Sequence, residues 1–124
     1  MYFHVWFQTK RRTRVLLGDV DARIHELFAE IAKEKEYNLM AFETMIDHAH
    51  LLLEIADGKA LSFAVKAFKG GSARRIFEAF PALRFQMCSN NFWAKRFAAK
   101  EIPRSNLPIV EQYIRDQKKN LVEL

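Results

Sequence analysis

The sequence of 124 residues is poor in cysteine and glycine. Its one cysteine, Cys88, excludes an internal disulfide and a cysteine-based zinc site, and this usage fits a reducing compartment. We expect Cys88 to be a small buried hydrophobic residue. The chain has four glycines, and the pair Gly70-Gly71 is too short to form a glycine-rich phosphate loop. No nucleotide cofactor is therefore expected.

Long apolar segments are also missing. The longest apolar runs fall far short of the ~20 residues of a transmembrane helix. The first residues do not show the charged-then-apolar pattern of a secretory signal, and no internal repeat or low-complexity segment interrupts the chain. We therefore expect one domain over residues 1–124, in the cytoplasm and without a membrane partner.

Basic and apolar residues are abundant. Half of the residues are hydrophobic and eleven are phenylalanines, which favours a packed globular domain over disorder. The net charge of +5 and the isoelectric point near 9.5 suit a polyanionic partner. The basic residues gather in clusters along the chain. The candidate nucleic-acid contacts among them are Lys10, Arg11, Arg12, Lys69, Arg74, Arg75, Lys95 and Arg96.

Hydrophobic periodicity predicts an α+β fold. The expected strands span residues 2–9, 39–46, 47–55, 83–87 and 92–98, and the expected helices begin near Asp19 or Asp21, near Leu61 and at Pro108. We expect Gly70-Gly71 to bend or split the second helix, and residues 99–107 to form a mobile tether. The order β-α-β-β-α-β predicts a ferredoxin-like, RRM-like antiparallel sheet with an added C-terminal helix.

Two histidines occupy alternate positions of the run that ends at Ile55. Residues i and i+2 of a strand point to the same face, so His48 and His50 are expected to stand side by side. Asp47, Ala49 and Leu51 are then expected on the other face. Two adjacent imidazoles supply half of a divalent-metal site, and the alternative interpretation is a pair of unrelated surface histidines. His4 and His25 are assigned no role.

The C-terminal helix carries a second pattern. One face holds Val110, Tyr113, Ile114, Gln117 and Leu121 at spacings of three and four residues. Tyr113 and Gln117 are therefore neighbours one turn apart. Tyr113 alone could be a tyrosine at the rim of an apolar stripe, but a buried Gln117 amide requires polar partners.

Together these motifs resemble a known family. The pair Asp47-His48-Ala49-His50-Leu51-Leu52 and Gln112-Tyr113-Ile114-Arg115-Asp116-Gln117 resembles the HUH single-strand DNA endonucleases with one catalytic tyrosine. The match is close to the small transposases of the insertion-sequence 200/605 type, prokaryotic proteins that act on nucleoid DNA. Supporting matches are the opening run Phe3 to Arg12, the segment from Leu61 to Ser72 that ends in Lys-Gly-x-Ser, and Phe92 to Phe97.

The resemblance implies a specific chemistry. Tyr113 would be the nucleophile, and His48, His50 and Gln117 would bind Mg²⁺ or Mn²⁺. The product would be a 5′-phosphotyrosine bond with a free 3′-OH, made on hairpin-bearing single-stranded DNA during transposition. The family acts as a homodimer whose subunits share active sites.

Three alternatives remain open from the residues. One is an RRM-like module that binds single-stranded nucleic acid without cutting it, although no run here fits the aromatic RNA-binding pattern of that fold. Another is a related tyrosine nuclease acting on chromosomal repeat hairpins. The last is a structural derivative that no longer cleaves.

Overall fold

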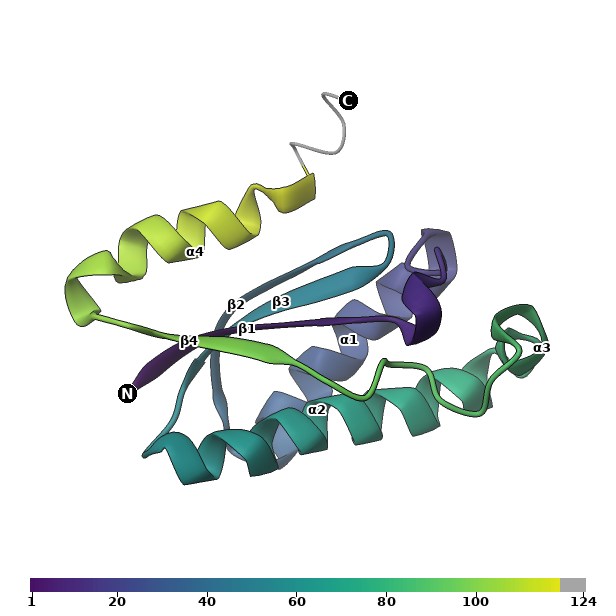
Figure 1. Cartoon of the computed structure of the whole chain (residues 1–124), viewed down its shortest axis with the longest axis horizontal. Coiled ribbons are helices and arrows are strands. Elements are labelled where there is room, and N and C mark those ends of the chain that lie inside the picture. Colours follow the sequence, from purple (N-terminus) through teal and green to yellow (C-terminus); the bar gives the residue numbers. More distant parts are fainter. Residues whose placement is uncertain (119–124) are drawn as a thin grey trace.

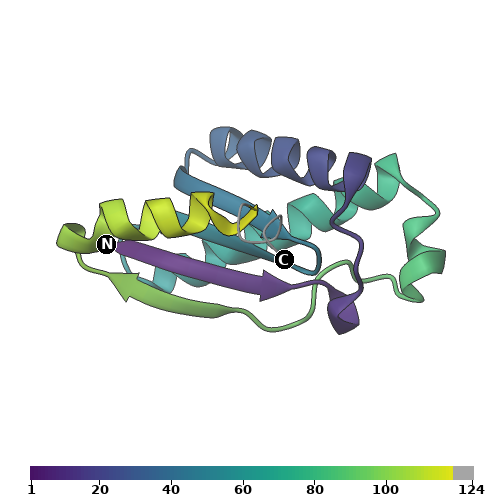
Figure 2. The same ribbon diagram turned by 90° about the horizontal axis from the view of Figure 1, so that it is seen from above.

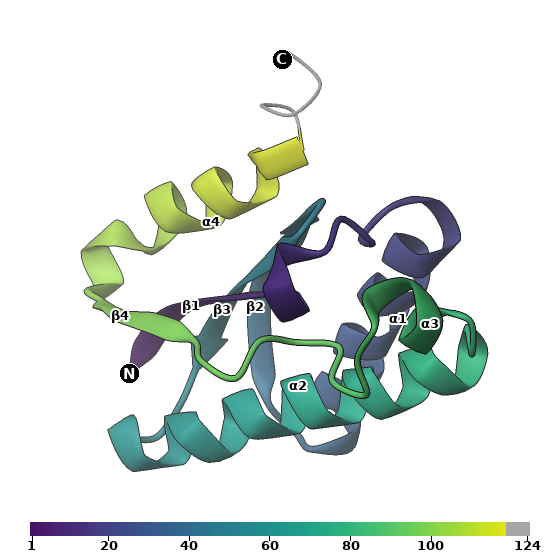
Figure 3. The ribbon, with the colours of Figure 1, turned by 45° about the vertical axis from the view of Figure 1, so that its right-hand side comes forward.

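The computed structural model describes residues 1–118 as three layers. The sheet lies in the middle, with α1 and α2 on one face and α4 on the other (Figures 1 and 3). The elements in chain order are β1 (Tyr2–Gln8), η1 (Lys10–Arg12), α1 (Gly18–Glu34), β2 (Asn38–Met45), β3 (His48–Glu54), α2 (Gly58–Ala79), α3 (Leu83–Met87), β4 (Ala98–Ile102), η2 (Arg104–Asn106) and α4 (Leu107–Arg115).

The sheet has the predicted antiparallel topology. Its four strands lie in the order β2-β3-β1-β4, and every neighbouring pair is antiparallel. The ferredoxin-like plan with an added C-terminal helix is therefore confirmed. Because β1 and β3 are central, the histidine run sits in the middle of the sheet, and α4 packs over β2 and β3 (Figure 2).

The layer of α1 and α2 closes the main core. Ile24, Leu27, Phe28 and Ile31 are buried on α1, as the spacing predicts. Helix α2 begins at Asp57, whose carboxylate accepts a hydrogen bond from the backbone N–H of Ala60 at 2.8 Å. A side-chain cap of this kind satisfies one of the free backbone donors of the first turn.

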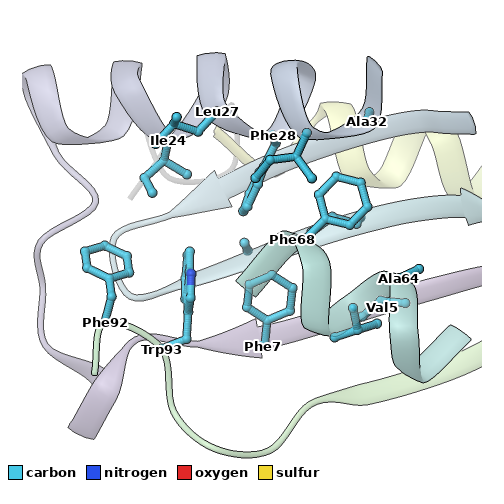
Figure 4. Packing of buried hydrophobic residues seen from close by; sticks show 14 of the residues in the cluster. Val5, Phe7, Ile24, Leu27, Phe28, Ala32, Ala64, Phe68, Phe92 and Trp93 are labelled. Carbon is cyan, nitrogen blue, oxygen red and sulfur yellow. The ribbon is translucent and has the colours of Figure 1, made fainter. Parts of the chain in front are cut away.

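Aromatic rings dominate this core (Figure 4). Phe28 packs edge-on against Phe7 at 6.2 Å and Phe68 at 6.0 Å between ring centroids, and it stacks on Trp93 at 6.1 Å. The Trp93 indole N–H donates to the Ser72 hydroxyl at 2.8 Å. The aromatic cluster therefore joins both helices, β1 and the segment before β4.

Two predicted strands near the C-terminal half are wrong. Leu83–Met87 is the short helix α3, in which Leu83 and Met87 are buried one turn apart and Phe85 is 89% exposed. The segment 92–97 is irregular: Trp93 forms an isolated bridge with Thr9, and Phe92 and Trp93 both pack into the main core. The last strand follows instead at Ala98–Ile102.

Glycine and cysteine also depart from expectation. Helix α2 runs through Gly70 and Gly71 without a break. A side chain at Gly71 would begin 3.0 Å from the Cδ1 atom of Ile31, so this glycine lets α1 and α2 approach closely. Cys88 is exposed rather than buried, and its φ of 50° ends α3 in the left-handed region.

Helix α4 forms a second, smaller core with the opposite face of the sheet. Leu107 and Ile114 of this helix are buried together with Ala41, Leu52 and Ile102. The expected tether over residues 99–107 is therefore mostly β4 and η2. Leu121, predicted on the same helix face, lies outside the described residues.

Within residues 1–118 no helix is both long enough and apolar enough to cross a bilayer.

The aromatic core supplies a stability prediction. Replacing Phe28 with Ala leaves a cavity in contact with four other rings, so we expect Phe28→Ala to lower the free energy of unfolding by about 3–5 kcal/mol. The same substitution at Phe85, which is 89% exposed, should change it by less than ~0.5 kcal/mol. Urea unfolding measures both. Equal losses for the two variants would show that Phe28 is not a core residue.

Candidate active site

The register between β1 and β3 places the histidines on the α4 face of the sheet. Trp6 pairs with His50 and Gln8 with His48, and directly opposed residues of antiparallel strands share a face. The alternate residues Ala49 and Leu51 are 0% and 1% exposed in the main core, as predicted.

His48 and His50 stand side by side, as the sequence predicts. Their ring centroids are 5.0 Å apart and the rings are nearly perpendicular, at 75°. His50 is 7% exposed, whereas His48 is only partly covered. The pair therefore has one deep member and one that faces solvent.

His48 is held by a carboxylate that the sequence prediction places on the wrong side. The Nδ1 atom of His48 lies 2.8 Å from Oδ1 of Asp47, because Asp47 belongs to the turn before β3 and is free of the strand alternation. Arg12 in turn donates from Nε to Oδ2 of Asp47 at 3.2 Å. With Nδ1 of His48 engaged by the carboxylate, its Nε2 atom carries the available lone pair.

Burial would raise the pKa of Asp47, but its partners decide the outcome. The hydrogen bond from His48 and the positive charge of Arg12 outweigh burial and lower the pKa of this carboxyl. Asp47 is therefore ionised at neutral pH and can accept the His48 proton in a hydrogen bond.

His50 is held by a third histidine, His4 of β1. Nε2 of His4 and Nδ1 of His50 are 2.9 Å apart, and the two rings stack with centroids at 5.1 Å. Sequence reasoning missed His4 because its partner lies 46 residues away. The available signal was its position on an alternating strand, on the same face as Trp6.

Electrostatics keep both of these histidines neutral. Burial lowers the pKa of His50 to about 4, with smaller contributions from His4 and His48. Burial and the charge of Lys100 also lower the pKa of His4. A neutral imidazole is the form that binds a metal ion.

Helix α4 brings Tyr113 next to these rings within the same chain. The Tyr113 ring lies edge-on to His50 at 6.2 Å and to His4 at 6.1 Å between centroids. Tyr113 is 53% exposed, so its phenol is accessible to a substrate. The structure thus unites two patterns that lie more than sixty residues apart in the sequence.

Gln117 is buried one turn further along. It is 7% exposed, and its side-chain amide nitrogen donates to the backbone oxygen of Tyr113 at 3.2 Å. This bond uses the nitrogen of the amide and leaves the oxygen as its available ligand atom.

A polar cluster of Asp21, His25, Glu43, Thr44 and Lys118 joins the end of α4 to α1 and β2. Lys118 contacts the carboxylate of Asp21 and lies 3.3 Å from that of Glu43. His25 bridges the same groups, at 3.0 Å from Glu43 and 3.1 Å from the Thr44 hydroxyl. Burial alone would lower the pKa of Lys118, but the two carboxylates raise it. The cluster therefore holds α4 over its own sheet.

Several of the predicted nucleic-acid contacts have partners inside the chain. Arg11 donates to the backbone oxygens of Met87 and Cys88, both at 2.8 Å, and so caps α3. Arg75 pairs with Glu34 at 2.6 Å and ties α2 to α1.

Lys69 also has an internal role. Its Nζ atom donates to the carbonyls of Ala94, Lys95 and Arg96 at 2.7, 3.1 and 3.3 Å. Burial lowers the pKa of this lysine. Lys69 therefore fixes the irregular segment before β4, which presents Lys95, Arg96 and Phe97 outward.

The remaining basic residues lie on the surface. Arg74, Lys95 and Arg96 are exposed, and Lys10 and Lys95 line a shallow cleft with Asn90 and Asn91. A second cleft beside His48 is lined by Arg14 and Asp47 among others.

The residues around the histidine pair fit a divalent metal. Both Nδ1 atoms have partners, Asp47 and His4, so the two Nε2 atoms are the ring nitrogens that could bind a metal. Among residues 1–118 no group of three His, Cys, Asp or Glu side chains can hold a metal, so a third protein ligand must be of another type. The Gln117 oxygen is of that type, and it suits Mg²⁺ or Mn²⁺.

The pKa of His50 generates a pH prediction for the metal-free protein. The unfolded His50 side chain takes up a proton near pH 6.5, whereas the native one does so only at about pH 4. Above pH 6.5 the titration of His50 therefore costs no unfolding free energy, and unfolding free energy is lost as the pH falls below 6.5. At pH 4 the loss amounts to about 3 kcal/mol of unfolding free energy. Urea titrations in EDTA at pH 7 and pH 4 should show this extra loss in the wild type and not in His50→Asn. Parallel losses in both proteins would contradict it.

Comparisons with known proteins agree with this geometry. The sequence model of the family "Transposase IS200 like" matches residues 1–117. The ISDra2 transposase TnpA of Deinococcus radiodurans is 31% identical over 115 residues, which cover 93% of this chain and 82% of that protein. The IS200 transposase of Salmonella typhimurium is 24% identical over 115 residues, covering 93% and 75% of the two chains.

Solved structures show the same fold. The crystal structure of a Deinococcus radiodurans protein classed as a transposase superposes with a TM-score of 0.76 at 32% identity, covering 94% of this chain and 90% of that one. A REP-associated tyrosine transposase bound to a REP hairpin superposes with a TM-score of 0.68 at 13% identity, covering 96% and 67%. The motif resemblance is thereby confirmed, and the chain belongs to the IS200-like transposase family.

Proposed function

We propose that this protein cuts and rejoins single-stranded DNA through a covalent bond to Tyr113, as the transposase of an insertion sequence. The observation that carries the proposal is the position of an accessible tyrosine ring about 6 Å from the ring of a neutral, buried histidine of an His-x-His pair. A tyrosine so placed can attack a phosphodiester that lies across the histidine face.

The reaction is a phosphoryl transfer. The phenol of Tyr113 gives up its proton and its oxygen forms a bond to phosphorus, while the bond from phosphorus to the 3′ oxygen breaks and that oxygen takes up a proton to become a 3′-OH. The strand remains attached as a 5′-phosphotyrosine. Attack by another 3′-OH reverses these steps and releases the phenol, so joining requires no nucleotide cofactor.

His48, His50 and Gln117 would hold Mg²⁺ or Mn²⁺ in this reaction. A bound divalent ion polarises the scissile phosphate and stabilises charge on the leaving oxygen. The chain's own contribution is to orient the two imidazoles, with Asp47 behind His48 and His4 behind His50, and to keep the buried His50 neutral.

Hairpin-bearing single-stranded DNA is the proposed substrate. Unpaired DNA can place one phosphodiester over a small exposed site, and the relative solved with a REP hairpin binds such a structure. Lys10, Lys95 and Arg96 on the surface, with Phe97 at 38% exposure, offer charge for phosphates and a ring for a base. Such a substrate places the reaction in the cytoplasm, where chromosomal DNA is accessible.

The structure disfavours a binding module without catalysis. In an RRM-like module the outer face of the central strands is open and stacks bases on aromatic rings. Here α4 covers part of that face and the histidines occupy it. The REP-associated tyrosine transposase shares the fold at 13% identity, but the 31% identity to the ISDra2 transposase favours a mobile element over a nuclease of chromosomal repeat hairpins.

Removal of one oxygen atom tests the nucleophile. We expect Tyr113→Phe to reduce the denaturant-resistant protein–DNA adduct by more than about 10³-fold, since only the attacking hydroxyl is lost. DNA affinity should stay within about threefold, because the exposed ring makes no core contact that the hydroxyl supports. A labelled hairpin-bearing strand with Mn²⁺, resolved on a denaturing gel, measures the adduct.

The matched control is Tyr37→Phe, the same chemical change in a ring that packs on Phe68 at the helix-covered face. This variant should form wild-type levels of adduct. A covalent species in Tyr113→Phe would show that another residue attacks. If the wild-type protein forms as much adduct in EDTA as with Mn²⁺, the reaction does not require a metal.

We further propose a homodimer that shares active sites. Strand β4 is an edge strand with unpaired backbone groups, and α4 begins within five residues of its end. A two-fold axis beside β4 would bring the start of α4 close to the partner's sheet. Each α4 could then make its present contacts with the sheet of the partner subunit instead of its own. The linker is shorter than the sequence suggests, because only 103–106 separate the two elements, a reach of about 13 Å when extended.

Mixing two inactive proteins tests the exchange. A dimer of one His48→Ala chain and one Tyr113→Phe chain contains one hybrid site with intact histidines and tyrosine. At equal concentrations half of the dimers are mixed, so about a quarter of wild-type sites should recover. With subunit exchange verified, a mixture that forms no adduct would place Tyr113 with its own histidines.

A further inference from the structure

His4 is the one histidine near the site for which the proposed chemistry has no use as a ligand or nucleophile. It is partly buried on β1, opposite Leu52 rather than opposite either member of the pair. Its ring nevertheless touches three groups at once. The centroid distances are 4.9 Å to Trp6, 5.1 Å to His50 and 6.1 Å to Tyr113.

The contact with His50 is a hydrogen bond between two ring nitrogens. Nε2 of His4 and Nδ1 of His50 are 2.9 Å apart, so one proton is shared and one nitrogen must accept. A neutral imidazole has a single ring proton. If His50 donates from Nδ1, its Nε2 atom keeps a lone pair, whereas if His50 accepts at Nδ1, its Nε2 atom carries the proton.

Only the first arrangement leaves His50 able to bind a metal through Nε2. His48 has the equivalent arrangement, since its Nδ1 faces the Asp47 carboxylate, which can only accept. The two ligands would therefore be oriented by different partners. One is a carboxylate next to it in the chain, and the other is a neutral imidazole from the neighbouring strand.

We infer that His4 is a positioning residue that accepts the Nδ1 proton of His50 and thereby directs the Nε2 lone pair of His50 toward the metal. This inference rests on the proposed function. His4 itself is not a ligand, because its Nε2 atom is committed to His50. Its contact with the Tyr113 ring also ties the orientation of the nucleophile to that of the ligand.

If His4 acted only by packing, a side chain of similar shape would replace it whether or not that side chain accepts a hydrogen bond. A phenylalanine at position 4 preserves a planar ring between Trp6 and Tyr113 but cannot accept a hydrogen bond. A glutamine lacks the ring, yet its amide oxygen reaches about as far as Nε2 of histidine and does accept. If His4 acts by accepting a proton, Gln should replace it and Phe should not.

The test measures the tautomer and the metal affinity at one neutral pH. Long-range ¹H–¹⁵N spectra of the metal-free protein should show His50 protonated on Nδ1 in the wild type and in His4→Gln. In His4→Phe the Nε2-protonated form should be populated. The Mn²⁺ affinity, followed by electron paramagnetic resonance, should fall about 10–100-fold in His4→Phe and stay within about threefold in His4→Gln.

Each failure has a separate signature. A wild-type His50 protonated on Nε2, or an unchanged Mn²⁺ affinity in His4→Phe, overturns the role of His4. Equal losses of Mn²⁺ affinity in His4→Phe and His4→Gln would show that His4 acts through packing, and would also overturn its role as a proton acceptor. If the wild-type protein does not bind Mn²⁺, the metal site of the proposed function is overturned, together with the inference that rests on it. Urea unfolding of each variant confirms that the fold is retained.

Discussion

The pairing register of β1 with β3 is the constraint on which the rest of the molecule depends. Side chains alternate between the two faces of a strand, so a slip by one residue would move His48 and His50 into the aromatic core. The same slip would expose Phe7 and Leu51. Burial of the apolar set against α1 and α2 therefore fixes the register, and the register delivers the histidines to the face that α4 covers.

The fold was largely readable from the sequence because most of its elements have strong periodicity. The two wrongly predicted strands lie between α2 and β4, where Leu-Arg-Phe-Gln-Met satisfies both a strand alternation and an i, i+4 helical pair. Only the tertiary contacts choose between them, since Leu83 and Met87 are both buried. Phe92 and Trp93 mislead for a related reason, because their aromatic character suggests a strand while they fill the core from an irregular segment.

The site was predictable where its residues are close in the chain. His48 with His50, and Tyr113 with Gln117, each follow from local spacing, but nothing local shows that α4 lies beside β3 or that His4 reaches His50. Basic residues were read less well, because Arg11 and Lys69 have the composition of phosphate contacts but bind backbone carbonyls. Which cations are satisfied internally depends on contacts between distant segments.

We propose that His48 and His50 present their Nε2 atoms to one divalent ion beside Tyr113. Anomalous diffraction at the manganese edge, from crystals grown with Mn²⁺, tests it most directly. We expect one strong peak about 2.0–2.3 Å from both Nε2 atoms, with the Gln117 oxygen at a similar distance. A peak bound through an Nδ1 atom, or manganese bound elsewhere while the histidine pair stays empty, would contradict the claim.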